Sequence, residues 1–282
     1  MNGPDAKNQP RVLIVKLSSL GDIFHALPAV HQLKTGLNAT IDWVTQMNYV
    51  DLVGHFPDVE RVIGFPRKRF PVHAAKFLRT LRAEKYDLIV DLQGLLKSAF
   101  VARCARGSRR IGPSFHREGS AWFYSDVAGP RNRNRHAVDE ALDVVRHLGL
   151  AMDTPVFPVS FPRNPLDTPA PRVAIIPCSR WPTKNWPIAG FIEVANALRR
   201  AAKASIYLVG GPDDIESCRN LETAVQGPVV NTCGKTSLVE LGSLLQEMDL
   251  VFSVDPVPLH MAAALGSPLL AVFGATEPLR TG

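Results

Sequence analysis

The turn Ser18-Ser19-Leu20-Gly21-Asp22 is the first place in this sequence where residue types and spacing suggest chemistry. It follows an apolar run at residues 12–15 and precedes apolar residues at helical spacing, so it joins a predicted buried strand to a helix. Asp22 at the start of that helix can cap free backbone N–H groups, which is a structural role. Ligands of open α/β sheets, however, bind beyond the carboxyl ends of the strands, where a carboxylate can act as general base on an uncharged hydroxyl. The position of Asp22 fits both roles equally.

A second polar stretch, residues 179–187 (SRWPTKNWP), follows a predicted strand at residues 172–176. It is cationic and aromatic, and it lies where a parallel strand ends. Lys184 in this stretch could neutralise a diphosphate leaving group. The alternative is a surface loop whose tryptophans pack at the edge of a domain, and the residues alone leave both interpretations open.

An acid and a histidine, Asp255 and His260, flank a predicted helix start after the strand at residues 250–254. Such side chains could bind sugar hydroxyls and phosphate groups. A histidine beside an apolar helix face such as residues 261–264 is, however, more often simply packed.

The chain is basic, with a formal net charge of +6 and a pI of about 9.3. A basic surface indicates an anionic partner: nucleic acid, a membrane surface or a phosphorylated substrate. Basic residues gather at Arg67-Lys68-Arg69 and in residues 106–135. A run of charged residues is usually a solvated surface. Several basic runs in the first half of the chain, however, indicate that this half binds an anionic substrate. Nucleic acid is disfavoured because the sequence has no recognisable binding module and little aromatic interleaving.

The sequence lacks the motifs of several common sites. It has no P-loop, GxGxxG, HExxH or GxSxG pattern. Its cysteines are scattered without a CxxC pair, which argues against a zinc site or a disulfide framework and indicates ordinary buried or half-buried thiols at Cys104, Cys178, Cys218 and Cys233. No apolar run approaches the roughly 20 residues that span a bilayer. The polar N-terminus lacks the apolar core of a signal peptide, so we expect a cytoplasmic protein.

Hydrophobic patterning predicts a parallel sheet with covering helices in each half of the chain. In the first half, strands are predicted at residues 12–15, 41–45, 59–65 and 87–91, and helices at residues 23–33, 72–85, 95–104 and 136–148. Residues 106–135 are predicted to be loop-rich. In the second half, strands are predicted at residues 172–176, 205–209, 250–254 and 268–273, and helices at residues 188–202, 213–224, 237–248 and 259–265.

Six prolines between residues 151 and 171 separate the two halves. A stretch so rich in proline propagates neither a helix nor a central strand. We therefore predict an N-terminal α/β domain at residues 1–150 and a C-terminal α/β domain at residues 172–282. Residues 151–171 are predicted to be a linker, or a linker plus an edge strand. Strand ends that face each other across a cleft would form a site for a small ligand.

Five stretches, in order along the chain, resemble motifs of glycosyltransferase family 9, the ADP-heptose:lipopolysaccharide heptosyltransferases. They are VKLSSLGDIFHALPAV at residues 15–30, YDLIVDLQGLLKSAF at residues 86–100, HAVD at residues 136–139, KNWP at residues 184–187, and residues 251–276. The resemblance implies a GT-B fold, with two Rossmann-like domains facing across a cleft. It also implies inverting transfer of L-glycero-D-manno-heptose from ADP-heptose to a Kdo residue of the lipopolysaccharide inner core, without a cofactor or metal.

The resemblance assigns roles to residues of this chain. Asp22 matches the base that deprotonates the acceptor, and Lys184 matches the cation on the diphosphate. Nucleotide-sugar positions are matched by Ser179, Arg180, Asp214, Thr236, Asp255, Pro256, Val257 and His260. Acceptor binding is assigned to Ser18, Ser19, Arg67, Lys68 and Arg69. The expected partners are ADP-heptose and Kdo-lipid A, with peripheral contact to the inner membrane leaflet and no nucleic acid, and the expected state is a monomer.

The sequence departs from the family pattern in one loop. The family's Asp-Thr-Gly-Leu-Ser-His is here Asp255-Pro256-Val257-Pro258-Leu259-His260. Pro256 and Pro258 remove backbone N–H donors and Val257 replaces a permissive glycine, so donor binding is expected to be weaker or different. The chain also stops before the family's last elements, so we expect a truncated C-terminal domain.

Two alternatives follow from these departures: a nucleotide-sugar-binding relative without transferase activity, and a family 9 transferase that uses another nucleotide sugar. A Rossmann dehydrogenase is disfavoured because the glycine fingerprint is missing.

Overall fold

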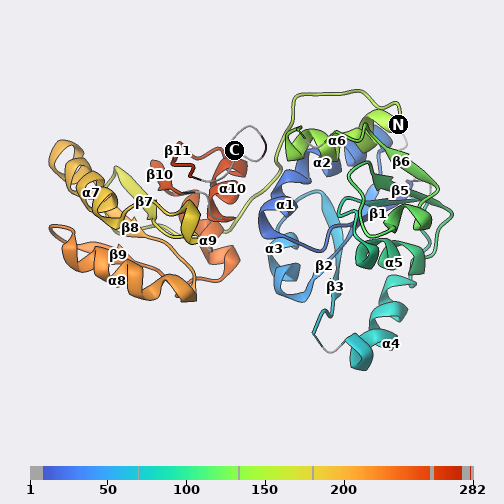
Figure 1. Ribbon diagram of the computed structural model, residues 1–282, viewed down its shortest axis with the longest axis horizontal. Helices are drawn as coiled ribbons and strands as arrows, with labels where there is room; N and C mark the ends of the chain where they lie inside the picture. The colour runs from blue at the N-terminus through green and yellow to red at the C-terminus, as the bar shows by residue number, and fades with distance from the viewer. Residues whose placement is uncertain are drawn as a thin grey trace, which may run out of the picture. The chain divides into compact units, whose positions relative to one another are not determined.

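The computed structural model describes residues 9–68, 70–132, 134–179, 181–254, 257–274 and 280. The chain divides into two compact units, Met1–Pro158 and Val159–Gly282. Each unit is an α/β unit with a parallel sheet and helices packed around it, as predicted (Figure 1). The division falls within the proline-rich residues 151–171. No helix within the described residues is long and apolar enough to cross a membrane.

The first unit contains a six-stranded parallel sheet in the order β3-β2-β1-β4-β5-β6. Its strands are β1 (Arg11–Val15), β2 (Thr40–Gln46), β3 (Val59–Phe65), β4 (Leu88–Asp91), β5 (Arg109–Pro113) and β6 (Asp126–Ala128). The chain first winds outward from β1 to β3 and then restarts at β4 on the other side of β1. The loops after β1 and β4 therefore diverge at a switch point, which is where sheets of this order bind their ligands.

Helices cover both faces of this sheet. They are α1 (Leu20–His25), α2 (Leu27–Leu37), α3 (Val50–Val53), α4 (Phe70–Leu81), α5 (Leu96–Cys104) and α6 (Ala137–His147), with short turns η1 (Met47–Tyr49) and η2 (Ser120–Phe123). Alternate residues of a strand point to opposite faces, so Leu13 and Val15 of β1 share a core cluster with Phe77 of α4 and Val101 of α5. On the other face, α2 and α6 pack side by side (Figure 1).

The second unit contains a five-stranded parallel sheet in the order β11-β10-β7-β8-β9. Its elements are β7 (Arg172–Ile176), η3 (Pro182–Lys184), α7 (Ile188–Ala202), β8 (Ser205–Leu208), η4 (Pro212–Asp214), α8 (Ile215–Ala224), β9 (Val229–Asn231), α9 (Leu238–Leu245), β10 (Leu250–Ser253), α10 (Val257–Ala264) and β11 (Leu269–Ala271). The winding direction reverses between β7 and β10, which gives this sheet its own switch point.

Three parts of the sequence prediction were wrong. The helix predicted over residues 23–33 is two helices, α1 and α2, because Pro28 occupies the first turn of a new helix, where its missing N–H is not needed. Residues 106–135, predicted to be loop-rich, contain β5, η2 and β6. The strand β9 was not predicted. These strands are short and lie towards the sheet edges, where polar residues are tolerated and the apolar alternation disappears.

A buried carboxylate ties four segments of the first unit together. Asp42 in β2 is fully buried and accepts hydrogen bonds from Arg11 Nη2 (2.9 Å), Arg61 Nη2 (2.7 Å) and Tyr86 Oη (2.8 Å). Burial and the neighbouring carboxylate raise the pKa of Tyr86, so its hydroxyl stays protonated and donates. The contacts link β1, β2 and β3 to the segment before β4.

We expect Asp42→Ala to lower the free energy of unfolding by about 3 kcal/mol, because it leaves two half-buried guanidinium groups and a buried hydroxyl without their acceptor. The matched control is Asp126→Ala, whose contact with Arg109 is 3.7 Å long and partly exposed, so its loss should cost less than about 1 kcal/mol. Urea unfolding followed by circular dichroism measures both. If both variants lower the free energy of unfolding by the same amount, Asp42 does not have this structural role.

Candidate functional site

Asp22 lies at the start of α1, directly beyond the carboxyl end of β1. Its Oδ2 accepts hydrogen bonds from the backbone N–H of Ser19 (2.9 Å) and from Ser19 Oγ (2.7 Å). The carboxylate thus has the capping role, and one oxygen remains for chemistry. Within the part of the chain that the structure describes, Oδ1 of Asp22 accepts no hydrogen bond, and the side chain is only half-buried.

A buried lysine keeps Asp22 ionised. Lys16 follows β1, is 7% exposed and donates from Nζ to the carbonyl oxygen of Leu92 (2.8 Å). Burial lowers the pKa of Lys16, against the opposing pull of nearby carboxylates. Burial alone would raise the pKa of Asp22, but the charge of Lys16, the hydrogen bonds from Ser19 and the nearby His25 together hold it below its ordinary value. Asp22 is therefore a carboxylate at neutral pH.

The loop after β4 is joined to the loop after β1 by Gln93, a residue for which the sequence predicted no role. Gln93 Oε1 accepts hydrogen bonds from the backbone N–H groups of Leu17 (3.1 Å) and Ser18 (2.9 Å). The buried Asp91 in turn accepts from the backbone N–H of Gln93 (2.7 Å). The signal in the sequence was the polar residue Gln93 in Leu92-Gln93-Gly94, directly after the strand predicted at residues 87–91. This loop and Asp22 meet at the switch point of the first sheet.

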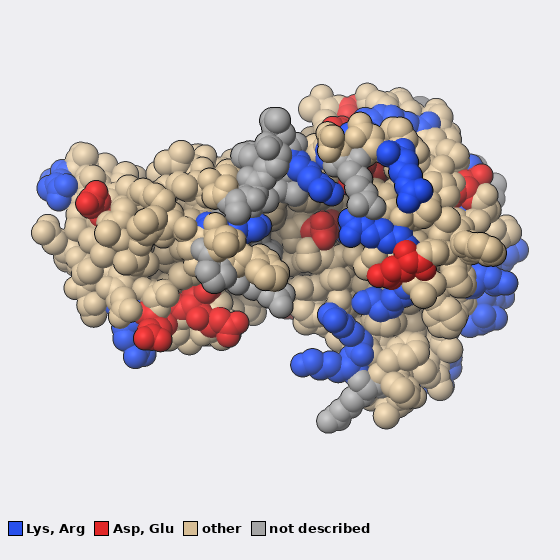
Figure 2. Space-filling view, in the orientation of Figure 1, with Lys and Arg blue, Asp and Glu red and all other residues tan. Residues whose placement is uncertain are grey.

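Two of the predicted acceptor residues line a groove at the carboxyl ends of β2 and β3. The groove has a volume of about 970 Å³ and lies against α4. Arg67 and Lys68 line it beside apolar side chains such as Phe65 and Phe77. Figure 2 shows Lys and Arg side chains gathered near the loop between β3 and α4. A surface of this kind suits an amphiphilic anion. Arg69, which was also predicted, lies outside the described residues.

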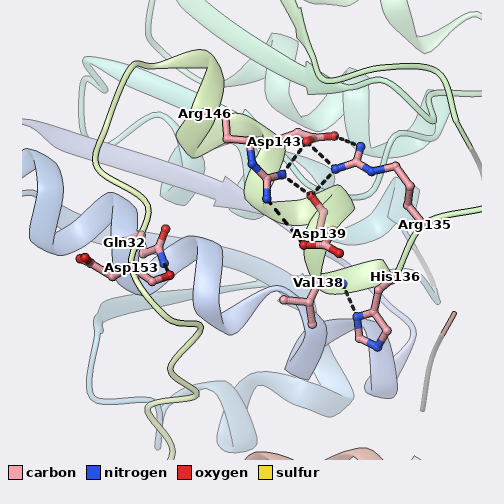
Figure 3. A network of polar contacts seen from close by, with 8 residues as sticks. All are labelled: Gln32, Arg135, His136, Val138, Asp139, Asp143, Arg146 and Asp153. Carbon is pink, nitrogen blue, oxygen red and sulfur yellow. Dashed lines mark hydrogen bonds and ion pairs between the residues drawn. The ribbon is translucent and has the colours of Figure 1, made fainter. Parts of the chain in front are cut away.

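Several arginines of the basic region 106–135 have structural roles instead. Arg110 donates from Nε and Nη2 to the carbonyl oxygens of Ala102 and Ala105 (both 3.1 Å) at the end of α5. Arg135 binds the buried Asp143 at 2.6 Å, and Arg146 binds it from the same helix at 2.9 Å (Figure 3). These side chains are engaged with the protein, so they do not mark an anion site.

The described nucleotide-sugar candidates all lie at the carboxyl edge of the second sheet. Ser179 and Lys184 follow β7, Asp214 follows β8, Thr236 follows β9, and His260 is in α10 after β10. Arg180, Asp255 and Pro256 lie outside the described residues, and the side chain of Val257 is not described either. Parallel strands therefore place the described candidates on one edge, as polar groups around a ligand site require.

Local contacts shape this edge. Asp214 Oδ2 accepts from the backbone N–H of Gly211 (2.8 Å), and Asn185 Oδ1 accepts from that of Ser179 (2.7 Å). A Cβ atom on Gly274 would lie 2.9 Å from the carbonyl oxygen of Thr183, so the loop after β11 packs against the loop after β7. The loops from β7, β8 and β11 are thus held in place by side-chain and backbone contacts.

The cysteines behave as ordinary thiols. Cys178, Cys218 and Cys233 are buried in the second unit and Cys104 is half-buried in the first. Burial raises the pKa of all four, which disfavours the reactive thiolate. Among the described residues, no group of three or more His, Cys, Asp or Glu side chains is placed to hold a metal ion.

Comparison with known proteins extends this picture. The family model for glycosyltransferase family 9 (heptosyltransferase) matches residues 74–282. Lipopolysaccharide heptosyltransferase 1 of Pseudomonas aeruginosa is 29% identical over 96% of this chain and 81% of its own length. The protein of the same name from Escherichia coli K12 is 29% identical over 95% of this chain and 89% of its own length.

Solved structures agree with these relatives. The E. coli heptosyltransferase WaaC with ADP matches with a TM-score of 0.79 and 27% identity, covering 95% of this chain and 88% of that chain. WaaC with ADP-2-deoxy-2-fluoro heptose matches with a TM-score of 0.80 and 27% identity, covering 95% of this chain and 90% of that chain. A glycosyl transferase family 9 structure from Veillonella parvula, 20% identical, has the same fold with a TM-score of 0.87 over 97% of this chain and 83% of that chain.

The charge of Lys16 predicts a measurable change at Asp22. In Lys16→Met, the apolar side chain keeps the volume but removes the positive charge, so the pKa of Asp22 should rise. The measurement is a carbon-13 NMR titration of the aspartate carboxyl signals, with the Asp22 signal identified by its loss in Asp22→Asn. Lys97→Met, which removes a cation that lies over Phe65 instead, should leave the titration unchanged. An Asp22 pKa that does not move in Lys16→Met would refute the coupling.

Proposed function

This chain belongs to glycosyltransferase family 9, and from that premise we propose that it moves L-glycero-D-manno-heptose from ADP-heptose to a Kdo residue of the lipopolysaccharide inner core, with inversion. It is a glycosyltransferase of the GT-B fold. The observation that supports this reaction most directly is the geometry of Asp22. Asp22 is an ionised carboxylate at the switch point of the first sheet, and its Oδ1 accepts no hydrogen bond within the described residues.

Asp22 acts as the general base in this proposal. The attacking hydroxyl of the acceptor donates a hydrogen bond to Oδ1, and the proton passes to Asp22 as the new glycosidic bond forms. A carboxylate with a lowered pKa is a weak base, so the proton moves late, when bond formation has made the hydroxyl acidic. Ser19 holds the other oxygen and so fixes the direction of the carboxylate.

The carboxyl edge of the second sheet receives the donor. As the acceptor oxygen bonds to the anomeric carbon, the bond from that carbon to the phosphate oxygen breaks and ADP leaves with both electrons. Lys184 neutralises the negative charge that develops on the diphosphate. We assign the remaining nucleotide-sugar contacts to Ser179, Asp214, Thr236 and His260, which follow β7, β8, β9 and β10. Arg180, Asp255, Pro256 and Val257 complete the proposed set.

Arg67 and Lys68 bind the anionic part of the acceptor, together with Arg69, Ser18 and Ser19. Both described side chains are exposed, and neither makes a side-chain hydrogen bond or ion pair within the described residues. Kdo carries a carboxylate and lipid A carries phosphates, so cations above an apolar groove suit this acceptor.

We propose that the protein works as a monomer on the cytoplasmic face of the inner membrane. An exposed stripe on α5 contains Leu96 (45% exposed), Phe100 (50%) and Arg103, and α5 packs against η2, which carries Trp122 (92% exposed). Tryptophan, phenylalanine and arginine together favour an anionic membrane surface. We call these four residues the α5–η2 patch.

One observation, the proline at the start of α10, supports two alternatives to the proposed function. Pro258 lies in the first turn of this helix, where it lacks the N–H that another residue would present. A loss of donor contacts there would favour a nucleotide-sugar-binding protein without turnover, or a transferase for another nucleotide sugar.

The transfer assay tests the proposed reaction. Incubation with ADP-heptose and Kdo-lipid A should add one heptose to the acceptor, detected by mass spectrometry. Asp22→Asn keeps an oxygen for the Ser19 hydrogen bonds but is no base, so the rate should fall about 10²- to 10⁴-fold while the KM for ADP-heptose changes little. Asp126→Asn, a partly exposed carboxylate in β6, is the control and should keep its rate.

A rate for Asp22→Asn near that of the unaltered chain would exclude Asp22 as the base. No product from the unaltered chain, together with ADP-heptose binding by calorimetry, would favour the binding protein.

Vesicle sedimentation tests the membrane contact. The protein should sediment with vesicles of phosphatidylglycerol and phosphatidylethanolamine, and Phe100→Ser with Trp122→Ser should reduce the bound fraction several-fold, because the apolar anchors are lost. Met152→Ser, which changes a similarly exposed apolar residue elsewhere in the first unit, should bind as before. Equal binding by both variants would rule out the α5–η2 patch as the contact.

A further inference from the structure

The side chain of Gln93 has a fixed orientation. Its Oε1 accepts hydrogen bonds from two backbone N–H groups, those of Leu17 and Ser18. Only the carbonyl oxygen of an amide can accept, so these two donors determine which end of the amide faces the loop after β1. The Nε2 group, with two N–H donors, is directed elsewhere.

The backbone around Gln93 is fixed as well. Asp91 Oδ1 accepts from the N–H of Gln93 (2.7 Å), and Lys16 Nζ donates to the carbonyl oxygen of Leu92 (2.8 Å). Gly94 adopts a positive φ of 70°, and its carbonyl oxygen accepts from Ser120 Oγ (3.0 Å). The residues before and after Gln93 are therefore held in place by side chains from other segments.

The two N–H groups of Gln93 Nε2 have no acceptor among the described residues. Gln93 is half-buried, and its amide nitrogen donates to no group within the described parts of the chain. It lies on the loop that binds Ser18, and the next residue, Ser19, holds Asp22. A fixed neutral donor and a fixed carboxylate are thus bound to two adjacent residues, Ser18 and Ser19, of the loop after β1.

We propose that Gln93 Nε2 donates a hydrogen bond to an oxygen of the acceptor sugar, next to the hydroxyl that Asp22 deprotonates. This inference rests on the proposed function, because it takes the acceptor to bind at Asp22. The contact suits a sugar acid, which offers a carboxylate or hydroxyl oxygen beside its reactive hydroxyl. An uncharged donor suits this position because a second cation near Asp22 would weaken the base further.

Two substitutions separate this contact from a purely structural role. Gln93→Glu keeps an oxygen that accepts from Leu17 and Ser18 but removes the N–H donors, whereas Gln93→Met removes both functions. If Gln93 only joins the two loops, Gln93→Glu retains activity and Gln93→Met loses it. We expect both variants to raise the acceptor KM about 5- to 10-fold, as the loss of one hydrogen bond predicts, with the KM for ADP-heptose unchanged.

The added negative charge of Gln93→Glu needs its own control. Arg117→Gln changes the net charge by the same amount, and its backbone N–H still donates to Gly94 (2.8 Å) while its side chain is exposed. This variant should have the same KM for the acceptor as the unaltered chain. Urea unfolding of all three variants checks that the loops remain folded.

A second measurement does not depend on turnover. In nitrogen-15-labelled protein, the side-chain amide signals of Gln93, identified by their absence in Gln93→Glu, should shift when free Kdo is added. If the unaltered chain transfers no heptose to Kdo-lipid A but these signals shift, the proposed reaction fails and the Gln93 contact stands. If transfer occurs and Gln93→Glu has an unchanged acceptor KM, the contact fails and the reaction stands. The contact is also overturned if added Kdo changes the chemical shifts of other residues to saturation but leaves the Gln93 side-chain signals unchanged.

Discussion

The first unit depends on a balance of charge buried at the ends of β1 and β4. Lys16 is a buried cation, and burial of an unpaired ammonium group would cost far more than folding can supply. Its charge is compensated by the nearby carboxylates of Asp22, Asp91 and Glu140 and by the carbonyl oxygen of Leu92. Because these groups come from separate segments, Lys16 couples the loop after β1 to the loop after β4.

The same balance sets the chemistry of the site. The positive charge of Lys16 lowers the pKa of Asp22, so in the proposed reaction Asp22 can accept a proton without losing one first. The lowered pKa also makes Asp22 a weaker base, which the proposed reaction tolerates because the attacking hydroxyl becomes acidic as its bond to the sugar forms. The neutral Gln93 joins the loops without adding charge, and the cations that suit an anionic acceptor, Arg67 and Lys68, follow β3 instead.

The sequence predicted most of this architecture because local patterns encode it. β7 and α7 have the predicted bounds because they are an apolar run and an amphipathic repeat between clear breaks. β3 has the predicted bounds too, although its apolar alternation is weak. Asp22 was recognisable because it follows a predicted strand at the start of a helix. Arg67 and Lys68 were recognisable because they belong to a basic cluster that matches a basic region of the family. Lys16 and Gln93 were not, because their partners lie about 76 positions away in the sequence and are brought together only by the pairing of β1 with β4.

Net charge was a weaker guide than geometry. A count of arginines in residues 106–135 suggests an anion site, yet Arg110 caps the end of α5 and Arg135 neutralises the buried Asp143. A guanidinium bound to protein carbonyls or to a buried carboxylate has little left to offer a ligand. Arg67 and Lys68 differ because their exposed side chains line a groove and make no polar side-chain contact within the described residues. The proposed anionic acceptor therefore has cations available at the end of β3, where their side chains are not bound to other groups of the described residues.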